Sequence, residues 1–508
     1  MKYSAFIILL FVWEINLVFA INPPIDVEKW GMYEITLKGP VKGNPFHEVQ
    51  LQATFTHANK EVRVDGFYDG EGIFKIRFMP DLDGEWKYIT KSNNKKLNGK
   101  SGSLTCIAPS SDNHGPVFVS NTYHFKYADG SCYFPFGTTA YAWNHMPESI
   151  RKQTLKTLAE EPYFNKMRMC VFPKSWSFYI DEEPEYFPYE GEPGSFDFSR
   201  FKPIFFRELE QRILEMQELG IEVDLILFHP YDEGRWGFDR MSQEQDDQYL
   251  KYLITRVSAF RNVWWSLANE WDFMKEKEEA DFERFANIIL EKDPYHRLRS
   301  IHNGHTWYDH TRSWITHASI QHRNPKDVEK HRIKYGKPII HDEVSYEGNI
   351  QYSWGDLTAE EMSNRVWIGV CLGGYVTHGE TYFDEDTILW WSKGGVLKGK
   401  SHKRIEFLSE ILEDNDVCGL TPVHSKIDTW NDYYFGASGE DFFLFYFGSV
   451  QPAQRWIELP ERHNYRLDVF DTWNMNIIPL EGKYIGRVLV PLPGKPYIAI
   501  RAIRIEDN

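Results

Sequence analysis

Short apolar runs separated by amphipathic segments constrain the fold of this chain more than any other feature. Between two runs, residues 205–219 place Leu209, Ile213, Met216 and Leu219 on one face, which predicts a helix. Alternation of strands and helices on this scale predicts a (β/α)8 TIM barrel, of class α/β, rather than an open sheet. The eight runs read as strands are residues 132–137, 166–172, 221–228, 263–267, 298–302, 319–322, 338–342 and 374–378.

The regions on both sides of these runs have a different hydrophobic periodicity. Phe74, Ile76 and Phe78 alternate with polar residues, and the same period of two returns after a turn at residues 80–84. Short strands separated by turns are typical of antiparallel sandwiches. We therefore expect four segments: a leader at residues 1–20, an N-terminal β-sandwich at 21–108, a catalytic barrel at 117–418 after a linker, and a C-terminal β-sandwich at 419–508.

The first twenty residues have the pattern of a secretory signal peptide. Lys2 precedes an apolar run at residues 6–13, and Val18-Phe19-Ala20 offers a cleavage site. The run is shorter than the roughly 20 apolar residues of a membrane span. The alternative is a buried N-terminal strand. The leader predicts a secreted or periplasmic protein without a membrane span.

Charge and cysteine content narrow the classes of partner. The net charge is −17, and removal of the leader leaves it unchanged because Lys2 and Glu14 cancel. This balance argues against nucleic acid or an anionic membrane as partner. The cysteines contain no CxxC pair, so neither a zinc nor a thioredoxin-like motif is predicted. One disulfide is possible after secretion, and its partners stay open among Cys106, Cys132, Cys170, Cys371 and Cys418.

Two of the predicted strands end in a carboxylate. Residues 263–271 run through Asn269-Glu270, and residues 337–343 end at Glu343. These are the fourth and seventh strands, whose carboxyl ends open on the active-site face of a barrel. Two such carboxylates can flank a glycosidic bond, one protonated to donate and one ionised to attack. The alternative is a structural pair that caps helices or binds arginines.

These motifs resemble the clan A glycoside hydrolases, which are retaining (β/α)8 enzymes. The resemblance makes Glu270 the acid/base, Glu343 the nucleophile, and Arg168, at the end of strand two, a support for the nucleophile. The whole layout is similar to secreted bacterial glycosidases with an apiosidase-like or cellulase-family-5-like barrel between two sandwiches. Flanking signatures of that layout are Pro80, Asp81, Gly84, Trp86 and Tyr88, and Asp471-Thr472-Trp473.

The same resemblance implies an oligo- or polysaccharide substrate and no cofactor. The main alternative from another class is a non-catalytic carbohydrate-binding protein on a barrel scaffold. Both glutamates are present, and binding alone does not require an acid opposite a nucleophile, so the enzyme is favoured. The oligomeric state is left open.

Polar residues at other strand ends are candidates for sugar contacts. Arg168 could hold Glu343 ionised or form a structural ion pair, and Asn269 could bond a sugar 2-hydroxyl. His229, at the end of strand three, could bond a sugar hydroxyl or cap the barrel rim. His322 ends strand six, near the expected position of the nucleophile.

The end of strand eight departs from the clan pattern. His378 and Glu380 stand where many members carry a tryptophan, so this wall of the sugar site is open to question. Trp390 or Trp391 could replace that tryptophan, although two adjacent tryptophans are equally typical of a core.

The long connection at residues 173–203 is rich in aromatic side chains, beginning with Trp176. Loops of this length in a compact barrel are usually functional. Its aromatics could form the wall of a sugar site, or they could pack on one another as a lid. A wall that blocks one end of the cleft would favour exo action on a plant or host glycan.

Several histidines of the barrel region invite a metal interpretation. Their spacing forms neither an HxH nor an HExxH unit, so no catalytic metal is predicted. They are His302, His305, His310, His317 and His322.

Overall fold

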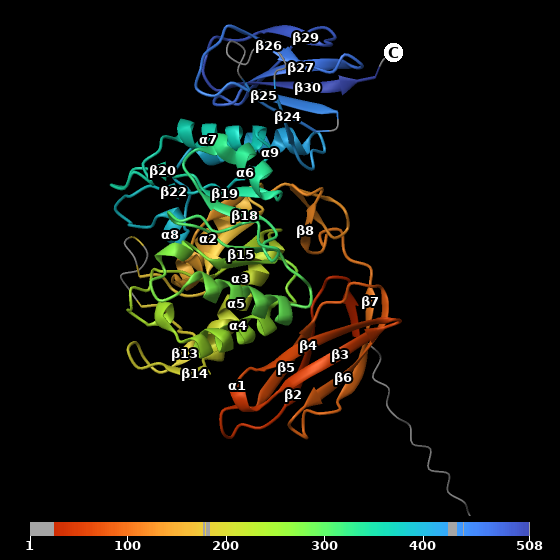
Figure 1. The fold of residues 1–508 in the computed structure, drawn as a ribbon, viewed down its shortest axis with the longest axis vertical. Helices are drawn as coiled ribbons and strands as arrows, with labels where there is room; N and C mark the ends of the chain where they lie inside the picture. Colours follow the sequence, from red (N-terminus) through yellow and green to blue (C-terminus); the bar gives the residue numbers. More distant parts are fainter. Residues whose placement is uncertain (1–24, 176–177, 179–182, 425–433, 440, 507–508) are drawn as a thin grey trace, which may run out of the picture.

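Eight parallel strands follow one another around a barrel in chain order. The barrel lies in the middle of the molecule, between the N-terminal and C-terminal sheets (Figure 1). Single bridges close the two gaps in the sheet, His302 to Ser319 and Thr138 to His378. The predicted fold class, a (β/α)8 barrel with flanking β-sandwiches, is confirmed. The barrel strands are β11(Gly137–Thr139), β12(Lys166–Cys170), β15(Glu222–Phe228), β16(Val263–Ala268), β17(Arg299–Ser300), β18(Ala318–Gln321), β19(Ile339–Glu343) and β21(Tyr375–Val376).

This computed structural model describes residues 25–175, 178, 183–424, 434–439 and 441–506. The expected leader and Trp176 lie outside the described residues. The helices around the barrel are α2(Glu148–Glu160), α3(Pro203–Glu218), α4(Gln243–Val257), α5(Glu279–Lys292), α6(Val328–Tyr335), α7(Ala359–Cys371), α8(Trp390–Lys393) and α9(Ser401–Glu413).

Helix α3 shows how the apolar stripe builds this layer. Leu209, Ile213 and Met216 are buried on its inner face, as the sequence predicts. Helix α4 begins at a capping box in which the Ser242 hydroxyl and the Gln245 side chain satisfy each other's backbone N–H groups. Such helices hold the strands in place and leave the chemistry to the loops at the strand ends.

The first barrel strand differs from the prediction of residues 132–137. Cys132–Tyr133 forms β10, which pairs with β9(His124–Tyr127) and through it with β8(Val117–Ser120), outside the barrel. Tyr133 is buried against Trp264 at the amino-terminal end of the strands. The run is therefore apolar because this small sheet closes the bottom of the barrel, and β11 starts at its last residue, Gly137.

The interior of the barrel holds a buried ion network. The Lys166 Nζ atom lies 2.8 Å from both Asp224 Oδ2 and Asp342 Oδ1. Arg168 Nε lies 3.4 Å from Asp224 Oδ2. Breaking such a pair leaves an uncompensated buried charge, which is strongly destabilising. The network fixes Arg168 directly below the strand ends.

The N-terminal domain is one seven-stranded sheet that folds over itself. Strand β4 pairs with β3 along its first part and with β5 along its last part. Phe55 and Phe78 stack in the resulting core with ring centroids 3.9 Å apart. The order is β1(Ile25–Glu28), β7(Ser101–Ile107), β6(Gly84–Ser92), β3(Leu51–His57), β4(Lys60–Tyr68), β5(Ile73–Phe78) and β2(Tyr33–Lys38), and the short α1(Pro45–Glu48) precedes β3.

Arg77 of β5 joins this domain to the barrel. Its side chain is buried, although the alternation of β5 predicts a polar outer face. Arg77 donates hydrogen bonds to the Glu210 carboxylate at 2.8 Å and to the Arg256 carbonyl at 2.7 Å. The outer face of the sheet therefore docks on helices α3 and α4.

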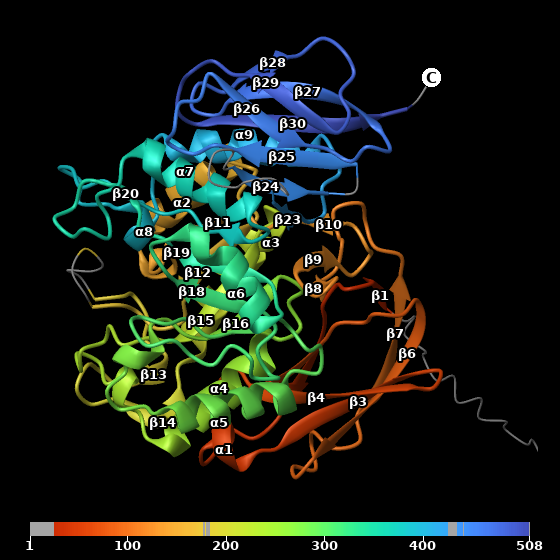
Figure 2. The same cartoon turned by 45° about the horizontal axis from the view of Figure 1, so that its top comes forward.

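The C-terminal domain lies over α7 and α9 (Figure 2). Tyr446 anchors it there, because its hydroxyl donates to the Asn364 side chain of α7 at 3.0 Å. Its six-stranded sheet has the order β23(Thr421–Val423), β24(Phe435–Ser438), β25(Phe442–Tyr446), β30(Ile498–Ile505), β27(Asn464–Asp471) and β28(Asn476–Pro479), with the hairpin pair β26(Gln454–Glu458) and β29(Arg487–Pro491) beside it.

A disulfide joins Cys132 to Cys418 across 286 residues. It links the plug below the barrel to the end of the barrel region. Cys106, Cys170 and Cys371 are buried free thiols.

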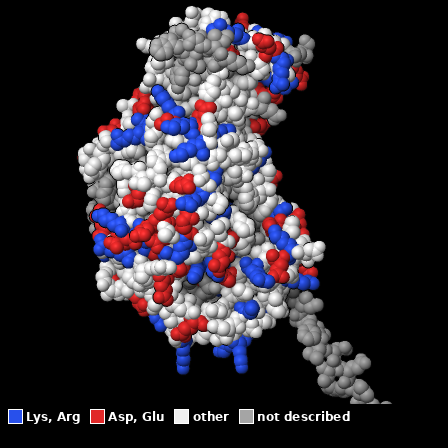
Figure 3. Space-filling model, viewed as in Figure 1, with Lys and Arg blue, Asp and Glu red and all other residues white. Residues whose placement is uncertain are grey.

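The visible surface is mixed in charge. On the face that Figure 3 shows, basic and acidic side chains are interspersed. Within the described residues, no helix is both long and apolar enough to cross a membrane.

Candidate active site

The carboxyl ends of the barrel strands surround a cavity of about 390 Å³. Glu270, Glu343 and Asn269 line it together with Lys174 and Gln321. Aromatic side chains form much of the remaining wall. They are Tyr141, Tyr231, Phe273, Tyr346, Tyr352, Trp354 and Trp391.

Glu343 is the last residue of β19, and donors hold both of its oxygens. The Tyr141 hydroxyl donates to Oε1, and Trp354 Nε1 donates to Oε2 at 3.1 Å. Hydrogen bonds to a carboxylate favour its ionised form. The two donors therefore fix the orientation of the Glu343 carboxylate and stabilise its negative charge.

Arg168 supports Glu343 mainly through Tyr141. Its Nη1 atom lies 3.8 Å from Glu343 Oε1, but donates to the Tyr141 hydroxyl at 2.9 Å. Its Nη2 atom donates to Asn269 Oδ1 at 3.1 Å. One buried guanidinium thus orients two of the residues that line the cavity, and its contact with Glu343 is an ion pair rather than a short hydrogen bond.

Glu270 follows β16 in a strained backbone conformation. Its φ of 49° and ψ of 56° lie in the left-handed region, which is unusual for a residue other than glycine. The side chain is buried, and Oε2 has no hydrogen-bond partner among the described residues. In this conformation the carboxyl group lines the cavity, where a substrate can meet it.

The two glutamates differ in electrostatic environment. Burial and then the charge of Glu343 raise the pKa of Glu270 to about 8, against opposing effects of Lys174 and Gln321. Burial also raises the pKa of Glu343, but Arg168, the Tyr141 hydroxyl and Lys174 act against that rise. The environment of Glu270 favours the protonated carboxyl group, whereas the donors around Glu343 favour its ionised form.

Lys174 brings a buried cation to the same cavity. Its Nζ atom lies 4.1 Å from the ring centroid of Tyr141 and 4.0 Å from that of Tyr231. Burial lowers the pKa of Lys174 to about 8, although both glutamates act in the opposite direction. The lysine therefore lies where it influences both carboxyl groups.

The three histidines predicted to contact sugar do not line the cavity. His229 accepts from the Tyr231 N–H at 3.2 Å and contacts the Phe172 carbonyl, so it caps the rim and positions Tyr231. His322 points away and pairs with Asp327 at 2.8 Å. The alternation of side chains in β18 explains this, because Gln321 takes the inward direction.

His378 is the third of these residues. It is fully buried, and its Nδ1 atom contacts the Thr138 hydroxyl at 3.1 Å. The wall at strand eight is built instead by Trp391, which lines the cavity at 6.0 Å from the Tyr346 ring. Trp390 is core, and its Nε1 atom donates to Thr138.

Most described aromatics of residues 173–203 pack on one another. Phe187, Tyr189, Phe196 and Phe198 surround Phe238, with ring centroids within 6.5 Å of it. The short strands β13(Tyr189–Glu190) and β14(Asp197–Phe201) pair within this lid. The self-packed interpretation is thus favoured for this part, and Trp176 lies outside the described residues.

Sequence reasoning missed Tyr141, Trp354 and Lys174. Tyr141 follows β11 by two residues, so the correct first strand would have placed it at a strand end. Lys174 and Trp354 stand in loops, where no periodicity marks them. Of the five histidines considered for a metal, His305 lines the cavity.

The sequence of the chain matches a known protein family over the barrel and its surroundings. Residues 119–438, more than half of the chain, match the family described as the apiosidase-like catalytic domain. The chain belongs to this family. This apiosidase-like protein is a glycoside hydrolase, which confirms the resemblance to clan A and favours the enzyme over a carbohydrate-binding scaffold. Two domain families of unknown function match its residues 26–93 and 427–503.

Solved structures agree with this assignment of the apiosidase-like enzyme. It is 39% identical to a candidate glycoside hydrolase from Bacteroides vulgatus ATCC 8482, with a TM-score of 0.89 over 95% of this chain and 100% of that chain. A family 5 glycoside hydrolase from the same organism shares the fold at 15% identity, with a TM-score of 0.59 over 77% of this chain and 94% of that chain. No protein with a curated description matches the enzyme.

Proposed function

We propose that this glycoside hydrolase cleaves O-glycosidic bonds with retention of configuration, using Glu343 as nucleophile and Glu270 as acid/base. The observation that carries the proposal is the unequal environment of two buried carboxyl groups in one cavity. Glu343 accepts bonds from Tyr141 and Trp354, whereas burial and a neighbouring charge keep a proton on Glu270. Retention requires the two groups about 5 Å apart, and inversion requires a wider gap for water.

The reaction has two displacements. In the first, Glu343 attacks the anomeric carbon while Glu270 gives its proton to the leaving oxygen, so a glycosyl-enzyme forms. In the second, ionised Glu270 takes a proton from water, which attacks the same carbon and releases Glu343. Asn269, with its carbonyl oxygen held by Arg168, has its amide donor available for the sugar 2-hydroxyl.

We further propose exo action on a plant or host glycan. The cavity of about 390 Å³ is at the small end of ligand cavities. A small cavity favours a chain end over a long internal segment. Rapid loss of viscosity of a polymer, with few monosaccharides released early, would contradict exo action.

We also propose that the enzyme is exported. The leader-like sequence at residues 1–20 and the Cys132–Cys418 disulfide support this, because disulfides persist in oxidising compartments. The mass of the enzyme recovered from periplasm or medium checks it, and it should correspond to a chain that begins at Ile21.

The experiment that tests the two roles is azide rescue on an activated aryl glycoside. Glu343→Ala should lose the first displacement, and azide should then replace the nucleophile to give a glycosyl azide of inverted configuration. Glu270→Ala should still form the glycosyl-enzyme, which azide should intercept to give the retained azide. Glu385→Ala is the matched control, because this exposed carboxylate lies outside the cavity and its loss should yield no azide product.

Two results would overturn the assignment. Opposite azide configurations from the two variants would exchange the roles of the glutamates. Near-normal turnover of both variants would show that they are not the catalytic pair.

A further inference from the structure

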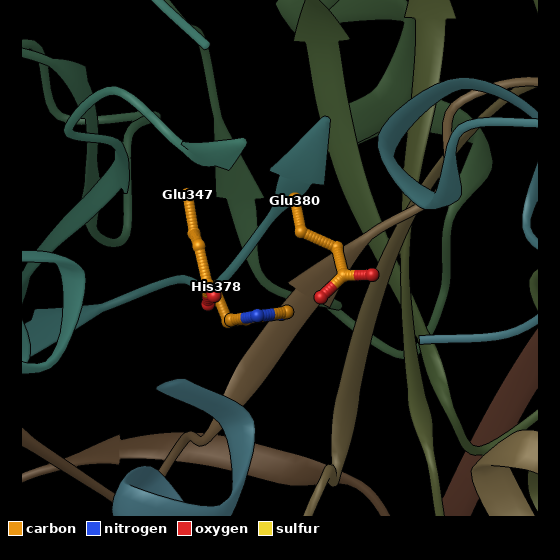
Figure 4. Close-up of side chains that lie close together, drawn as sticks. All are labelled: Glu347, His378 and Glu380. Atoms are coloured by element: carbon orange, nitrogen blue, oxygen red, sulfur yellow. The ribbon is translucent and has the colours of Figure 1, made fainter. Parts of the chain in front are cut away.

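Behind the wall of the cavity lie two buried carboxylates and one buried imidazole. Glu347 belongs to β20(Glu347–Gly348) and Glu380 belongs to β22(Glu380–Thr381). His378 lies two residues after β21 and bridges to Thr138. One potential ligand atom from each lies within 4.8 Å of the other two. Figure 4 shows the His378 ring beside the two carboxyl groups.

The two carboxylates are close because of strand register. Glu347 and Glu380 are direct partners in the parallel pair of β20 and β22. Like charges directly opposite each other are destabilising, and burial increases the cost. Such an arrangement calls for a compensating positive group.

Among the described residues, neither carboxyl group forms an ion pair with a lysine, arginine or histidine. Glu380 accepts the N–H groups of Lys398 and Gly399, and Glu347 accepts those of Lys400 and Ser401. The Lys398 ammonium lies elsewhere, 2.7 Å from Asp384 and 2.9 Å from Asp386. Backbone donors orient the two carboxyl groups but bring no full positive charge to them.

His378 provides the observation that points to a ligand. Its Nδ1 atom is engaged with Thr138, whereas Nε2 has no hydrogen-bond partner among the described residues although the side chain is fully buried. A buried polar atom without a partner costs free energy. An imidazole held through Nδ1 is the usual arrangement of a histidine that binds metal through Nε2.

Gly399 keeps space open between the carboxylates. A Cβ atom at this residue would lie 2.5 Å from Glu380 Oε2 and 2.6 Å from Glu347 Oε2. Each of these oxygens accepts one hydrogen bond from the described residues, so each retains a lone pair. The free lone pairs therefore flank a point where no side chain stands.

We propose that Glu347, His378 and Glu380 bind a divalent transition-metal ion, of the class of Zn²⁺ or Mn²⁺. One imidazole and two carboxylates suit such an ion better than Ca²⁺, which takes oxygen ligands. Ligands bonded at about 2 Å are at most about 4 Å apart, so small side-chain rotations close the site. The ion would tie β20 to β22 and so fix Tyr346 and Thr381, the adjacent residues that line the cavity.

The test measures metal content and thermal stability of the full-length enzyme. After dialysis against a chelator and then metal-free buffer, ZnCl2 or MnCl2 is added, and bound metal is counted by mass spectrometry. We expect about one ion per chain and a rise in Tm of about 5 °C at a hundredfold excess over Kd. CaCl2 and MgCl2 at the same concentration should give no comparable rise.

A matched pair of variants locates the ion. His378→Asn keeps an amide group near Thr138 and removes Nε2, so both the bound metal and the Tm rise should disappear. His317→Asn is the control, because His317 is also fully buried, contacts a threonine hydroxyl through Nδ1 at 3.1 Å and has a partnerless Nε2. It should bind metal like the wild type.

The proposal is overturned if the wild-type enzyme binds less than a tenth of an equivalent of metal and its Tm does not change. A proton shared by Glu347 and Glu380 would then relieve the repulsion between their carboxyl groups. It is also overturned if His378→Asn retains the ion, if His317→Asn loses it, or if only Ca²⁺ or Mg²⁺ acts. Should His378→Asn fail to fold, the wild-type stoichiometry and Tm response still decide.

Discussion

The Arg168 guanidinium contacts Glu343 less closely than it contacts Tyr141, whose hydroxyl stands between them. Nη1 lies 3.8 Å from the Glu343 oxygen and 2.9 Å from the Tyr141 hydroxyl, which itself donates to Glu343. The positive charge therefore acts through an oriented phenol. Because Arg168 also faces Asp224 and Asp342 inside the barrel, Arg168→Ala should impair folding as well as activity.

Tyr141→Phe is consequently the cleaner test of this support. Loss of the hydroxyl should lower kcat/KM about a hundredfold, the scale of one preorganised donor. The hydrogen bond from Tyr141 lowers the pKa of Glu343, so its loss should raise that pKa. The acidic limb of the pH–rate profile should then move to higher pH. Tyr133→Phe removes an equally buried hydroxyl that donates to the Asn165 carbonyl, and its pH profile should match the wild type.

The basic limb of the profile should report Glu270. Since burial raises the pKa of Glu270 to about 8, kcat/KM should fall as the pH rises through about 8 and the acid loses its proton. Lys174→Met should raise that pKa further, because the lysine lowers it, and shift the limb upward. Lys174→Arg should restore the wild-type position. A downward shift in Lys174→Met would contradict the assignment of this limb to Glu270.

Glu222 should make stability depend on pH. Burial raises the pKa of this carboxyl group to about 8, above its unfolded value of about 4.3. Glu222 therefore makes its full contribution to the free energy of unfolding below about pH 4, and this contribution is lost as the pH rises towards 8. Glu222→Gln keeps an acceptor for Trp264 Nε1. The Tm of this variant should rise relative to that of the wild type as the pH increases from 5 to 8.

Glu210→Gln is the control of opposite sign. Burial opposes ionisation of Glu210, but Arg256 and Arg77 outweigh it and lower its pKa to about 2. The glutamine variant should therefore be less stable than the wild type across the same range. Equal responses of the two variants would contradict this electrostatic explanation.

The disulfide should contribute to stability. Cys132→Ser/Cys418→Ser should lower the Tm, because the bond closes a segment of 286 residues and such bonds contribute about 2–5 kcal/mol. A reductant should lower the Tm of the wild type and leave that of the double variant unchanged. A wild-type Tm that does not respond to reductant, although mass spectrometry shows two added hydrogens, would contradict the prediction.

The sequence by itself determined the barrel and the position of Glu270 and Glu343 at strand ends. Local periodicity carries this information, because an apolar run between amphipathic helices must be a buried strand, and the residue that ends it must reach the mouth. Seven of the predicted strands coincide with observed barrel strands over two or more residues. The first shares only Gly137 with β11, since residues 132–136 are apolar through burial under the barrel and periodicity cannot tell that burial from a barrel strand.

Only the tertiary structure decided which polar side chains meet. Tyr141, Lys174 and Trp354 enter the cavity from loops, and His322 turns away because Gln321 takes the inward direction of β18. The pairing of Glu347 with Glu380 depends on the register of two short strands 33 residues apart. Such contacts arise from closure of the barrel and have no local pattern in the chain, so no reading of the sequence alone supplies them.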